Sequence, residues 1–391
     1  MPAAVMIIGL IFMLFALGGA NYYLARRLYQ CIGFIFPQTN IKVYTGVFIF
    51  MAFVMMIGFA RSLLPLPVLV KNILGVAGSY WMGIFIYLFL FFVTADVVIM
   101  LGSLFQAIPK PIPQGIRFFS GLAVVLLTLI TVVYGVVHAN QIKHVAYEIP
   151  VETASPVSGL NIVMLSDIHL GAVNSEKRLE KIVQGVSDLK PDLVCIAGDI
   201  FDNDYYAIHN PDKAAGLLRS MTSKYGVYVS LGNHDGGETL DEMLAFLERS
   251  NIKALNDEQV VIDNRLVLAG RLDSSPIGGF GDMGRQDLSE VMAGTDKDLP
   301  VVVMDHNPAN IGEYGSGVDL VLCGHTHRGQ IFPGSLFTKA MFEVDYGYYK
   351  KDDSSPHIVV SSGAGTWGMP MRVGTDCEIV SIKLKGGQFT E

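Results

Sequence analysis

Four long apolar stretches occupy most of the first 140 residues of this 391-residue chain. A helix needs about 20 predominantly apolar residues to cross the hydrocarbon core of a bilayer. The stretches that approach this length are residues 5–25, 43–60, 80–101 and 115–137. The sequence therefore predicts four membrane-spanning helices before a region of different composition.

The first stretch has two interpretations, a cleaved signal peptide and a retained span. It has no basic residues ahead of its apolar run, the run is longer than that of a signal peptide, and three further spans follow. We therefore expect it to be retained. Asp96 lies within the third stretch, where an acid often serves function. We favour a structural role for Asp96, at the membrane interface or paired with a polar group of a neighbouring span.

Charge is divided unevenly along the chain. Residues 1–150 contain eight Lys or Arg but only Asp96 and Glu148 as acids, whereas residues 151–391 contain 20 bases and 34 acids. This division predicts a transmembrane domain at 1–145, a polar linker at 146–159 and a soluble catalytic domain at 160–391. The acidic domain would repel nucleic-acid phosphates, so we expect no nucleic-acid partner.

The basic residues near the spans predict an orientation in the cell membrane, because cytoplasmic loops carry the excess of Lys and Arg. The first and third loops together carry Arg26, Arg27, Lys42, Lys110 and Arg117, and the second loop and final flank carry Arg61, Lys71 and Lys143. With four spans, this places the N-terminus and the catalytic domain outside the cytoplasm.

After residue 160, short β-branched runs alternate with amphipathic helical patterns. Strands are predicted at 161–166, 192–197, 226–230, 260–269, 301–304, 319–323, 358–361 and 378–383, and a helix at 176–189. Strand–helix alternation followed by consecutive strands predicts an α/β fold with two sheets packed as a sandwich and flanked by helices.

Five segments rich in histidine and carboxylate occur in this region, and several of them follow predicted strands. They are Asp167-Ile-His169, Gly198-Asp199-Ile-Phe-Asp202, Gly232-Asn233-His234-Asp235, Asp305-His306-Asn-Pro308 and Gly324-His325-Thr-His327. Because ligands collect at strand ends in such sheets, we expect the segments to converge at one end. We expect Asp167 and His169 to alternate along an extended strand end, and Gly232 and Gly324 to allow sharp turns.

Carboxylate oxygen and imidazole nitrogen suit divalent ions such as Mn, Fe, Zn or Co. No thiolate is among the candidates, which excludes a structural zinc finger. Two ions about 3.5–4 Å apart can bind both non-bridging oxygens of a phosphate and deliver a hydroxide in line. Core packing explains such a set poorly, and a two-metal hydrolytic centre explains it well.

In this order, the five segments resemble the calcineurin-like metallophosphoesterase superfamily, whose pattern is DxH, GDxxD, GNHD/E, a lone His and GHxH. The resemblance covers about residues 160–385. The runs Gly324-His-Thr-His-Arg-Gly-Gln-Ile-Phe-Pro333 and Gly363-Ala-Gly-Thr-Trp-Gly-Met-Pro-Met-Arg372 are similar to those of its bacterial membrane-associated subgroup. The apolar N-terminal region lies outside the superfamily pattern.

The resemblance implies a role for each site residue. One metal would be held by Asp167, His169 and His327, the other by Asn233, His306 and His325, and Asp199 would bridge the two. His234 would donate a proton to the leaving group, with Asp235 orienting its ring, and Asp202 would align a ligand from behind the metals. Many relatives have an arginine where this chain has Asn203, and Arg328 is a candidate substitute or a solvated surface residue.

Together these features predict a membrane-anchored two-metal phosphoesterase that cleaves a phosphate ester or pyrophosphate with a metal-bridging hydroxide. Anchoring to the bilayer favours a lipid-linked substrate. The alternatives are a phosphatase or phosphodiesterase acting on soluble nucleotides or phosphoproteins, and a sensor that only binds a phosphorylated ligand. The aromatic and lysine-bearing segment 332–351 is either a loop that contacts membrane lipid or an insertion packed on the sheet.

Overall fold

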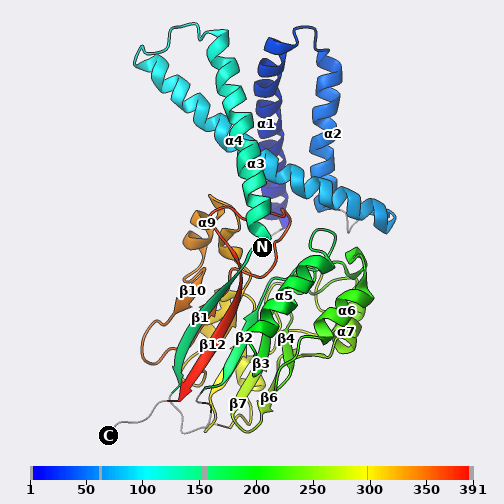
Figure 1. The fold of residues 1–391 in the computed structure, drawn as a ribbon, viewed down its shortest axis with the longest axis vertical. Coiled ribbons are helices and arrows are strands. Elements are labelled where there is room, and N and C mark those ends of the chain that lie inside the picture. Colours follow the sequence, from blue (N-terminus) through cyan, green and yellow to red (C-terminus); the bar gives the residue numbers. More distant parts are fainter. Residues whose placement is uncertain (1–2, 61–63, 152–156, 158, 297, 387–391) are drawn as a thin grey trace. The chain divides into compact units, whose positions relative to one another are not determined.

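The computed structural model of the chain describes residues 3–386 except 61–63, 152–156, 158 and 297. The chain divides into two compact units (Figure 1). The helical unit comprises Met1–Leu66 and Ile73–Tyr134, and the two-sheet unit comprises Pro67–Asn72 and Gly135–Glu391.

The first unit contains α1 (Ala3–Ile35), α2 (Ile41–Phe59) and most of α3 (Val68–Leu104) and α4 (Gln114–Ala139). Within the described residues, three segments are long and apolar enough to cross a membrane: Ile41–Gly58, Val68–Leu104 and Gln114–Ala139. Three of the four predicted spans are therefore found, and the first stretch, residues 5–25, is not among them within its described part. That stretch is helical, but Asn21, Arg26 and Arg27 follow its apolar run within the same helix and dilute the hydrophobicity of its described part.

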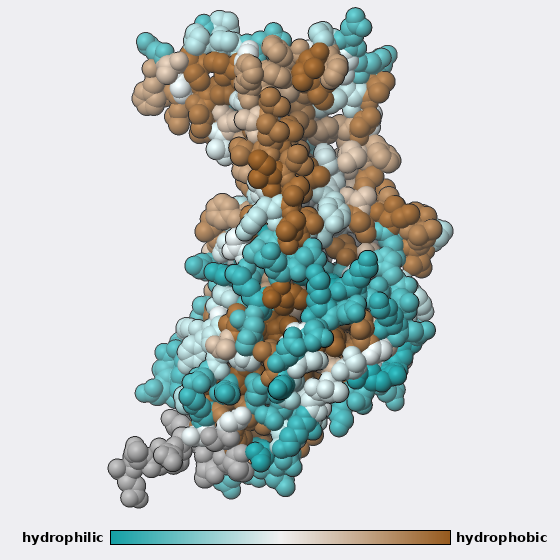
Figure 2. All heavy atoms as spheres, in the orientation of Figure 1, coloured by the Kyte–Doolittle hydropathy of each residue, from teal (hydrophilic) through white to brown (hydrophobic). Residues whose placement is uncertain are grey.

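Apolar side chains and close helix contacts hold this unit together. Figure 2 shows hydrophobic residues over much of its visible surface. A side chain at Gly58 or Gly78 would strike the backbone of the facing helix, so these glycines let α2 and α3 approach closely. Asp96 pairs with Arg27, whose Nη2 lies 2.7 Å from its Oδ1, and accepts a 2.7 Å hydrogen bond from the Tyr23 hydroxyl. The predicted pairing of Asp96 with a polar group of a neighbouring helix is confirmed.

The described residues of the second unit form two six-stranded sheets. The first has the order β1-β12-β2-β3-β4-β5, in which only β12 and β2 are antiparallel neighbours. Its strands are β1 (Ile142–Val151), β12 (Cys377–Gly386), β2 (Asn161–Leu165), β3 (Leu193–Ala197), β4 (Val227–Ser230) and β5 (Ile252–Ala254).

The second sheet has the order β10-β11-β9-β8-β7-β6, with parallel strands in its centre and an antiparallel strand at each edge. Its strands are β10 (Gly347–Tyr349), β11 (His357–Val360), β9 (Leu320–Cys323), β8 (Val301–Met304), β7 (Leu266–Gly270) and β6 (Glu258–Ile262).

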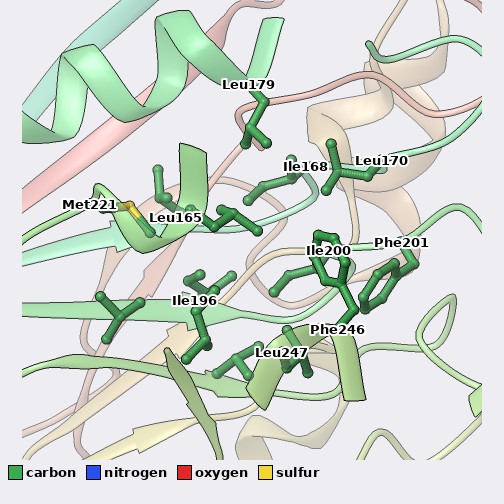
Figure 3. Packing of buried hydrophobic residues seen from close by; sticks show 14 of the residues in the cluster. Leu165, Ile168, Leu170, Leu179, Ile196, Ile200, Phe201, Met221, Phe246 and Leu247 are labelled. Atoms are coloured by element: carbon green, nitrogen blue, oxygen red, sulfur yellow. The ribbon is translucent and has the colours of Figure 1, made fainter. Parts of the chain in front are cut away.

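Helices pack against the sheets, which confirms the predicted two-sheet α/β sandwich. The helices α5 (Glu176–Asp188), α6 (Pro211–Arg219) and α7 (Leu240–Arg249) bury one apolar face against the first sheet, where Phe201 and Phe246 meet edge to face (Figure 3). A second apolar layer fills the space between the sheets. Short helices complete the unit: η2 (Tyr205–Ala207), α8 (Leu288–Val291), η3 (Pro308–Glu313), η4 (His327–Gly329) and α9 (Gly334–Met341).

Two details differ from the sequence prediction. The first part of the predicted linker 146–159 is strand β1, which pairs with β12 along its whole length; residues 152–156 and 158 of that linker lie outside the described residues. The predicted strand 260–269 is instead a hairpin, in which β6 and β7 are joined through Asp263 and Asn264, both with positive φ. Asn and Asp tolerate this conformation, so the chain reverses there.

Candidate metal centre

The five histidine- and carboxylate-rich segments lie at one edge of both sheets. They follow β2, β3 and β4 in the first sheet and β8 and β9 in the second. The strands β2, β3 and β4 are parallel to one another, as are β8 and β9, so within each sheet the carboxyl ends of these strands meet at the same edge. The predicted convergence of the segments is confirmed.

Backbone conformation aims several of these side chains. Five of the residues proposed from the sequence have left-handed φ values: Asp167 at 52°, His169 at 50°, Asp199 at 55°, His325 at 71° and His327 at 48°. Non-glycine residues adopt this region rarely and at a cost, and they do so mainly at functional sites. The expectation of an extended strand end at Asp167 and His169 is wrong, because β2 ends at Leu165 and the chain then turns twice.

Glycines lie directly behind the same side chains. A side chain at Gly232 would strike the carboxylate of Asp199, and one at Gly324 would strike that of Asp167. Neither Gly232 nor Gly324 has a positive φ, so the predicted sharp turns are not the reason for glycine here. These residues instead leave space for the carboxylates to approach the backbone.

One group of candidate ligands consists of Asp167, His169 and His327, all of them buried. The Nε2 of His327 lies 3.1 Å from Nε2 of His169 and 3.3 Å from Oδ1 of Asp167. Nitrogen lone pairs and a carboxylate oxygen therefore face one small volume, as they do around a divalent ion.

A second group gathers around His306. Its Nε2 lies 3.1 Å from Oδ2 of Asp199, and Nδ1 of His325 lies 2.9 Å from Oδ1 of Asn233. The His306 and His325 rings meet edge to face at 5.2 Å. The same Oδ2 of Asp199 lies 3.5 Å from Nε2 of His169, so one carboxylate oxygen faces both groups.

The His306 ring shows that the residues fit a cation. Its Nδ1 contacts the carbonyl of Ala197 at 2.8 Å and must donate there, which leaves Nε2 to face Asp199. Nε2 is buried and has no hydrogen bond of good geometry. Burial alone would lower the pKa of His306, but the Asp199 and Asp167 carboxylates more than offset this, and its pKa lies well above the usual value. A divalent ion would take the place of that proton.

Burial keeps three other histidines among the candidate ligands neutral. It lowers the pKa of His169 and of His325 to about 4, and burial together with the nearby Arg372 holds the pKa of His327 well below its usual value. Burial also raises the pKa of Asp167 to about 6. For Asp199 the surrounding histidines, His306 first, outweigh burial, so its pKa is well below the usual value. Neutral imidazoles and an ionised central carboxylate are the protonation states that metal binding requires.

His234 lies beside these groups. Its ring meets that of His169 at 5.0 Å and that of Trp367 at 5.7 Å, and its buried Nδ1 has no hydrogen-bond partner. Its backbone N–H donates to Oδ1 of Asp199 at 2.8 Å, which leaves Oδ2 for the two ligand groups. The His234 side chain is therefore beside the candidate ligands with an uncommitted ring nitrogen.

Asp235 does not orient the His234 ring, contrary to the expectation from the sequence. Its carboxylate accepts hydrogen bonds from the backbone N–H groups of Asp199, Phe201 and Gly232 at 2.7–2.9 Å. Asp235 thus joins the loop after β3 to the loop after β4. Asp202 lies closer to the predicted place, since its Oδ1 is 4.0 Å from Nδ1 of His169, and it forms a third acid–histidine group with His169 and His234.

Arg372 is a residue whose part in the site the sequence did not reveal. It is fully buried, and its guanidinium donates to the carbonyls of His327, Ser362 and Gly365 at 2.6–2.9 Å. Its Nη2 also lies 3.2 Å from Nδ1 of His327. Arg372 therefore fixes the backbone that carries His327. The other arginine considered, Arg328, lies 4.3 Å over the ring of Tyr346.

A pocket of about 520 Å³ opens onto the candidate ligands. Asp199, Asn233, His234, His325 and His327 form its polar floor, while Ile277, Trp367 and Met369 supply apolar walls. Gln330 braces that wall, because its side chain bonds the backbone of both Trp367 and Met369.

The helix α9 also lines this pocket, through Gly334 and Thr338. It has no buried residue, and Leu336, Phe337 and Met341 are each more than half exposed. The rest of the aromatic segment behaves differently, since Val344 is buried and Tyr349 packs against the same core cluster beside the second sheet. Packing on the sheet is therefore confirmed for this part of residues 332–351, whereas contact of the segment with membrane lipid stays a prediction.

Comparisons with known proteins agree with this geometry. Residues 160–329 match the calcineurin-like phosphoesterase family. Over 241 residues the chain is 34% identical to an uncharacterized metallophosphoesterase of Aquifex aeolicus, covering 61% of this chain and 90% of that protein. It is 30% identical to a transmembrane protein with metallophosphoesterase domain of Danio rerio, covering 78% of this chain and 72% of that protein. It is 31% identical to an uncharacterized metallophosphoesterase of Campylobacter jejuni, covering 76% of this chain and 78% of that protein.

The two-sheet fold and its cluster of histidines and acids are those of a metal-dependent phosphoester hydrolase. The chain belongs to the calcineurin-like metallophosphoesterase family.

Proposed function

We propose that this protein is a membrane-anchored two-metal phosphoesterase that cleaves a phosphate ester or pyrophosphate bond in a lipid-linked substrate. The observation that carries the proposal is the placement of Asp199 Oδ2, 3.1 Å from His306 and 3.5 Å from His169. One oxygen between two histidine-bearing groups is the arrangement expected of a ligand shared by two ions.

Each ion would have its own set of ligands. Asp167, His169 and His327 would hold one, and Asn233, His306 and His325 the other, with Asp199 common to both. When bound, two such ions supply Lewis acidity and an activated water for attack on phosphorus. All the donors are nitrogen or oxygen, which favours Mn, Fe or Zn.

The chain itself would orient the ligands and supply a proton. The Ala197 carbonyl holds the His306 ring in one tautomer, and the backbone N–H of His234 holds Asp199. The uncommitted His234 ring would donate a proton to the departing oxygen of the substrate. Asp202, whose carboxylate faces Nδ1 of His169, would stabilise the orientation of the His169 ring.

The proposal of a lipid-linked substrate is supported by the apolar surface next to the site. The pocket has the apolar walls Ile277 and Trp367 above its polar floor. The helix α9, which also lines the pocket, exposes Leu336, Phe337 and Met341. A substrate with a phosphate head and an apolar tail would satisfy both surfaces, whereas a soluble nucleotide would leave the apolar one unused.

Two variants test the catalytic assignment. His234→Ala should keep the metal content of the wild type but lose most turnover of a bis-aryl phosphate, about 10²–10⁴-fold for a missing general acid. Asp199→Ala should lose metal as well. His209→Ala, which changes an exposed histidine outside the site, is the matched control. Unchanged turnover of metal-replete His234→Ala protein would refute the assigned role.

The substrate class needs a separate comparison. Wild-type protein should hydrolyse a phospholipid or a nucleotide-linked lipid with a higher kcat/KM than a soluble phosphomonoester or diester. The opposite preference would favour soluble nucleotides or phosphoproteins. Binding of phosphorylated ligands without any metal-dependent hydrolysis would instead identify a sensor.

The location of the catalytic unit follows from the distribution of Arg and Lys. The excess of these residues before α2 and in the connection between α3 and α4 would place both segments in the cytoplasm and the unit after α4 outside it, whether three or four helices cross the membrane. We propose the extracytoplasmic location. A reporter fused after the last strand, active only in the cytoplasm, would exclude it.

A further inference from the structure

The helical unit contains a polar pocket of its own, about 380 Å³ in volume. It is lined by α1, α3, the connection between α3 and α4, and the start of α4. Four cations, Arg26, Arg27, Lys110 and Arg117, lie around it, and the acid lining it is Asp96. In Figure 1 the α1–α2 and α3–α4 connections lie at the same end of this unit.

Arg27 is the buried cation of this pocket, only 7% exposed. Its Nη2 pairs with Asp96 at 2.7 Å and its Nη1 donates to Oε1 of Gln30 at 2.8 Å. Its buried Nε has no hydrogen-bond partner. The second oxygen of Asp96 accepts from the Tyr23 hydroxyl, so both carboxylate oxygens are already engaged.

Ser103 supplies a second uncommitted donor. It is 8% exposed, lines the same pocket, and its buried Oγ has no hydrogen-bond partner. Buried polar groups in folded proteins are almost always paired, and those that are not need an explanation. Two such donors facing one pocket are explained by an acceptor that binds there.

Charge identifies that acceptor as an anion. Within residues 1–147 Asp96 is the only acid of the sequence, so it can balance only one of the four cations at the pocket. Arginine pairs well with phosphate, whose several oxygens accept charge-assisted hydrogen bonds. Ile99, Met100 and Ile112 line the pocket beside these donors and would contact an apolar group attached to the phosphate.

We propose that this pocket binds the phosphate group of an anionic ligand, with Arg27 and Ser103 at its base and Arg26, Lys110 and Arg117 around it. The apolar lining favours the head group of a membrane lipid as the source of that phosphate. The site is separate from the metal centre, because it is built entirely from the helical unit.

Native mass spectrometry of the full-length protein in detergent tests the proposal. The probes are a phosphonate analogue of phosphatidic acid, which is not hydrolysed, and diacylglycerol with the same tails. We expect the phosphonate lipid to bind at least about tenfold more tightly than diacylglycerol. The double substitution Lys110→Gln with Arg117→Gln should remove this preference for one bound lipid. Any lipid held at the metal centre would be unaffected, because neither residue belongs to that site.

Lys42→Gln is the matched control, since Lys42 is an exposed cation of the same unit that does not line the pocket. Ser103→Ala adds a neutral test that leaves the charge unchanged and should weaken phosphonate binding without changing diacylglycerol binding. Inorganic phosphate is the second arm: binding that depends on Lys110 and Arg117, without lipid preference, would support a phosphate site supplied from solution. Equal losses in Lys42→Gln and the double variant, or no loss in either, would overturn the proposal.

Discussion

Gly198 lies directly against the imidazole of His306: a β-carbon at this glycine would be 2.5 Å from Nδ1 of the ring. Gly198 also has a φ of 77°, and its neighbour Ala197 accepts the hydrogen bond from that same nitrogen. The end of β3 therefore sets both the position and the tautomer of a histidine carried by the other sheet. Small changes in this loop should therefore alter metal binding at the centre.

Gly198→Ala should lower metal affinity by about 10–100-fold, the range seen when groups that orient metal ligands are changed. The added methyl group would displace the His306 ring from Asp199. Metal content after dialysis, measured by elemental analysis, and calorimetric titration check this. Gly216→Ala is the control, because a β-carbon there meets nothing within 4 Å. Full metal content in Gly198→Ala would show that the ring adapts.

Arg372→Lys should destabilise the two-sheet unit although it keeps the charge. Lysine has no planar fork and cannot replace the bonds to the carbonyls of His327, Ser362 and Gly365. Loss of bonds from a buried charged group should cost about 3 kcal/mol, which a lower melting temperature and weaker metal binding would reveal. Arg265→Lys, on the turn between β6 and β7, serves for comparison. Equal melting temperatures for both variants would contradict the assigned role of Arg372.

Metal binding should release a proton and strengthen as the pH rises. The pKa of His306 is raised well above its usual value by Asp199 and Asp167, so in the metal-free site it is protonated at neutral pH. An ion must displace that proton, and affinity should fall as the pH falls. It should fall further below about pH 6, where Asp167 also takes up a proton. Calorimetry in buffers of different ionisation enthalpy measures the protons released; identical heats in all buffers would exclude the effect.

Charge on α9 should impair hydrolysis of lipid substrates selectively. Phe337→Asp places an acid on the exposed apolar side of the helix, so kcat/KM for a phospholipid should fall about tenfold or more while hydrolysis of a soluble bis-aryl phosphate is retained. Val261→Asp is the control, since Val261 is also exposed and apolar but lies on β6. A similar fall for both substrates would indicate damage to the pocket instead.

The position of the centre could be predicted from the sequence because it depends on local pattern. Parallel strands followed by polar segments bring Asp167, Asp199 and Asn233 to one edge whatever the details of the loops. The left-handed φ values of Asp167 and His325 could not be predicted, because the surrounding fold imposes them against residue preference.

The contact partners of several residues could not be predicted from the sequence either. Asp235 adjoins His234 in sequence, which suggested contact between their side chains, yet three backbone N–H groups compete successfully for its carboxylate. Arg372 binds carbonyl oxygens, which every residue possesses, so no sequence signal marks its partners. The sequence pattern does not predict strand β1, because the strand that pairs with it, β12, is far away in the sequence.

The position of β12 has a consequence for how the enzyme is made. This strand lies between β1 and β2 but follows both of them in the sequence by way of β3 to β11, so the ribosome must synthesise all of these strands before β1 finds its partner and β2 its second neighbour. Pairings so distant in sequence form slowly, and the exposed edges of β1 and β2 are open to wrong partners in the meantime. A nascent chain would therefore reach the bilayer with its helices complete but with β1 not yet joined to the rest of the first sheet. A chaperone would have its longest opportunity to act during this interval.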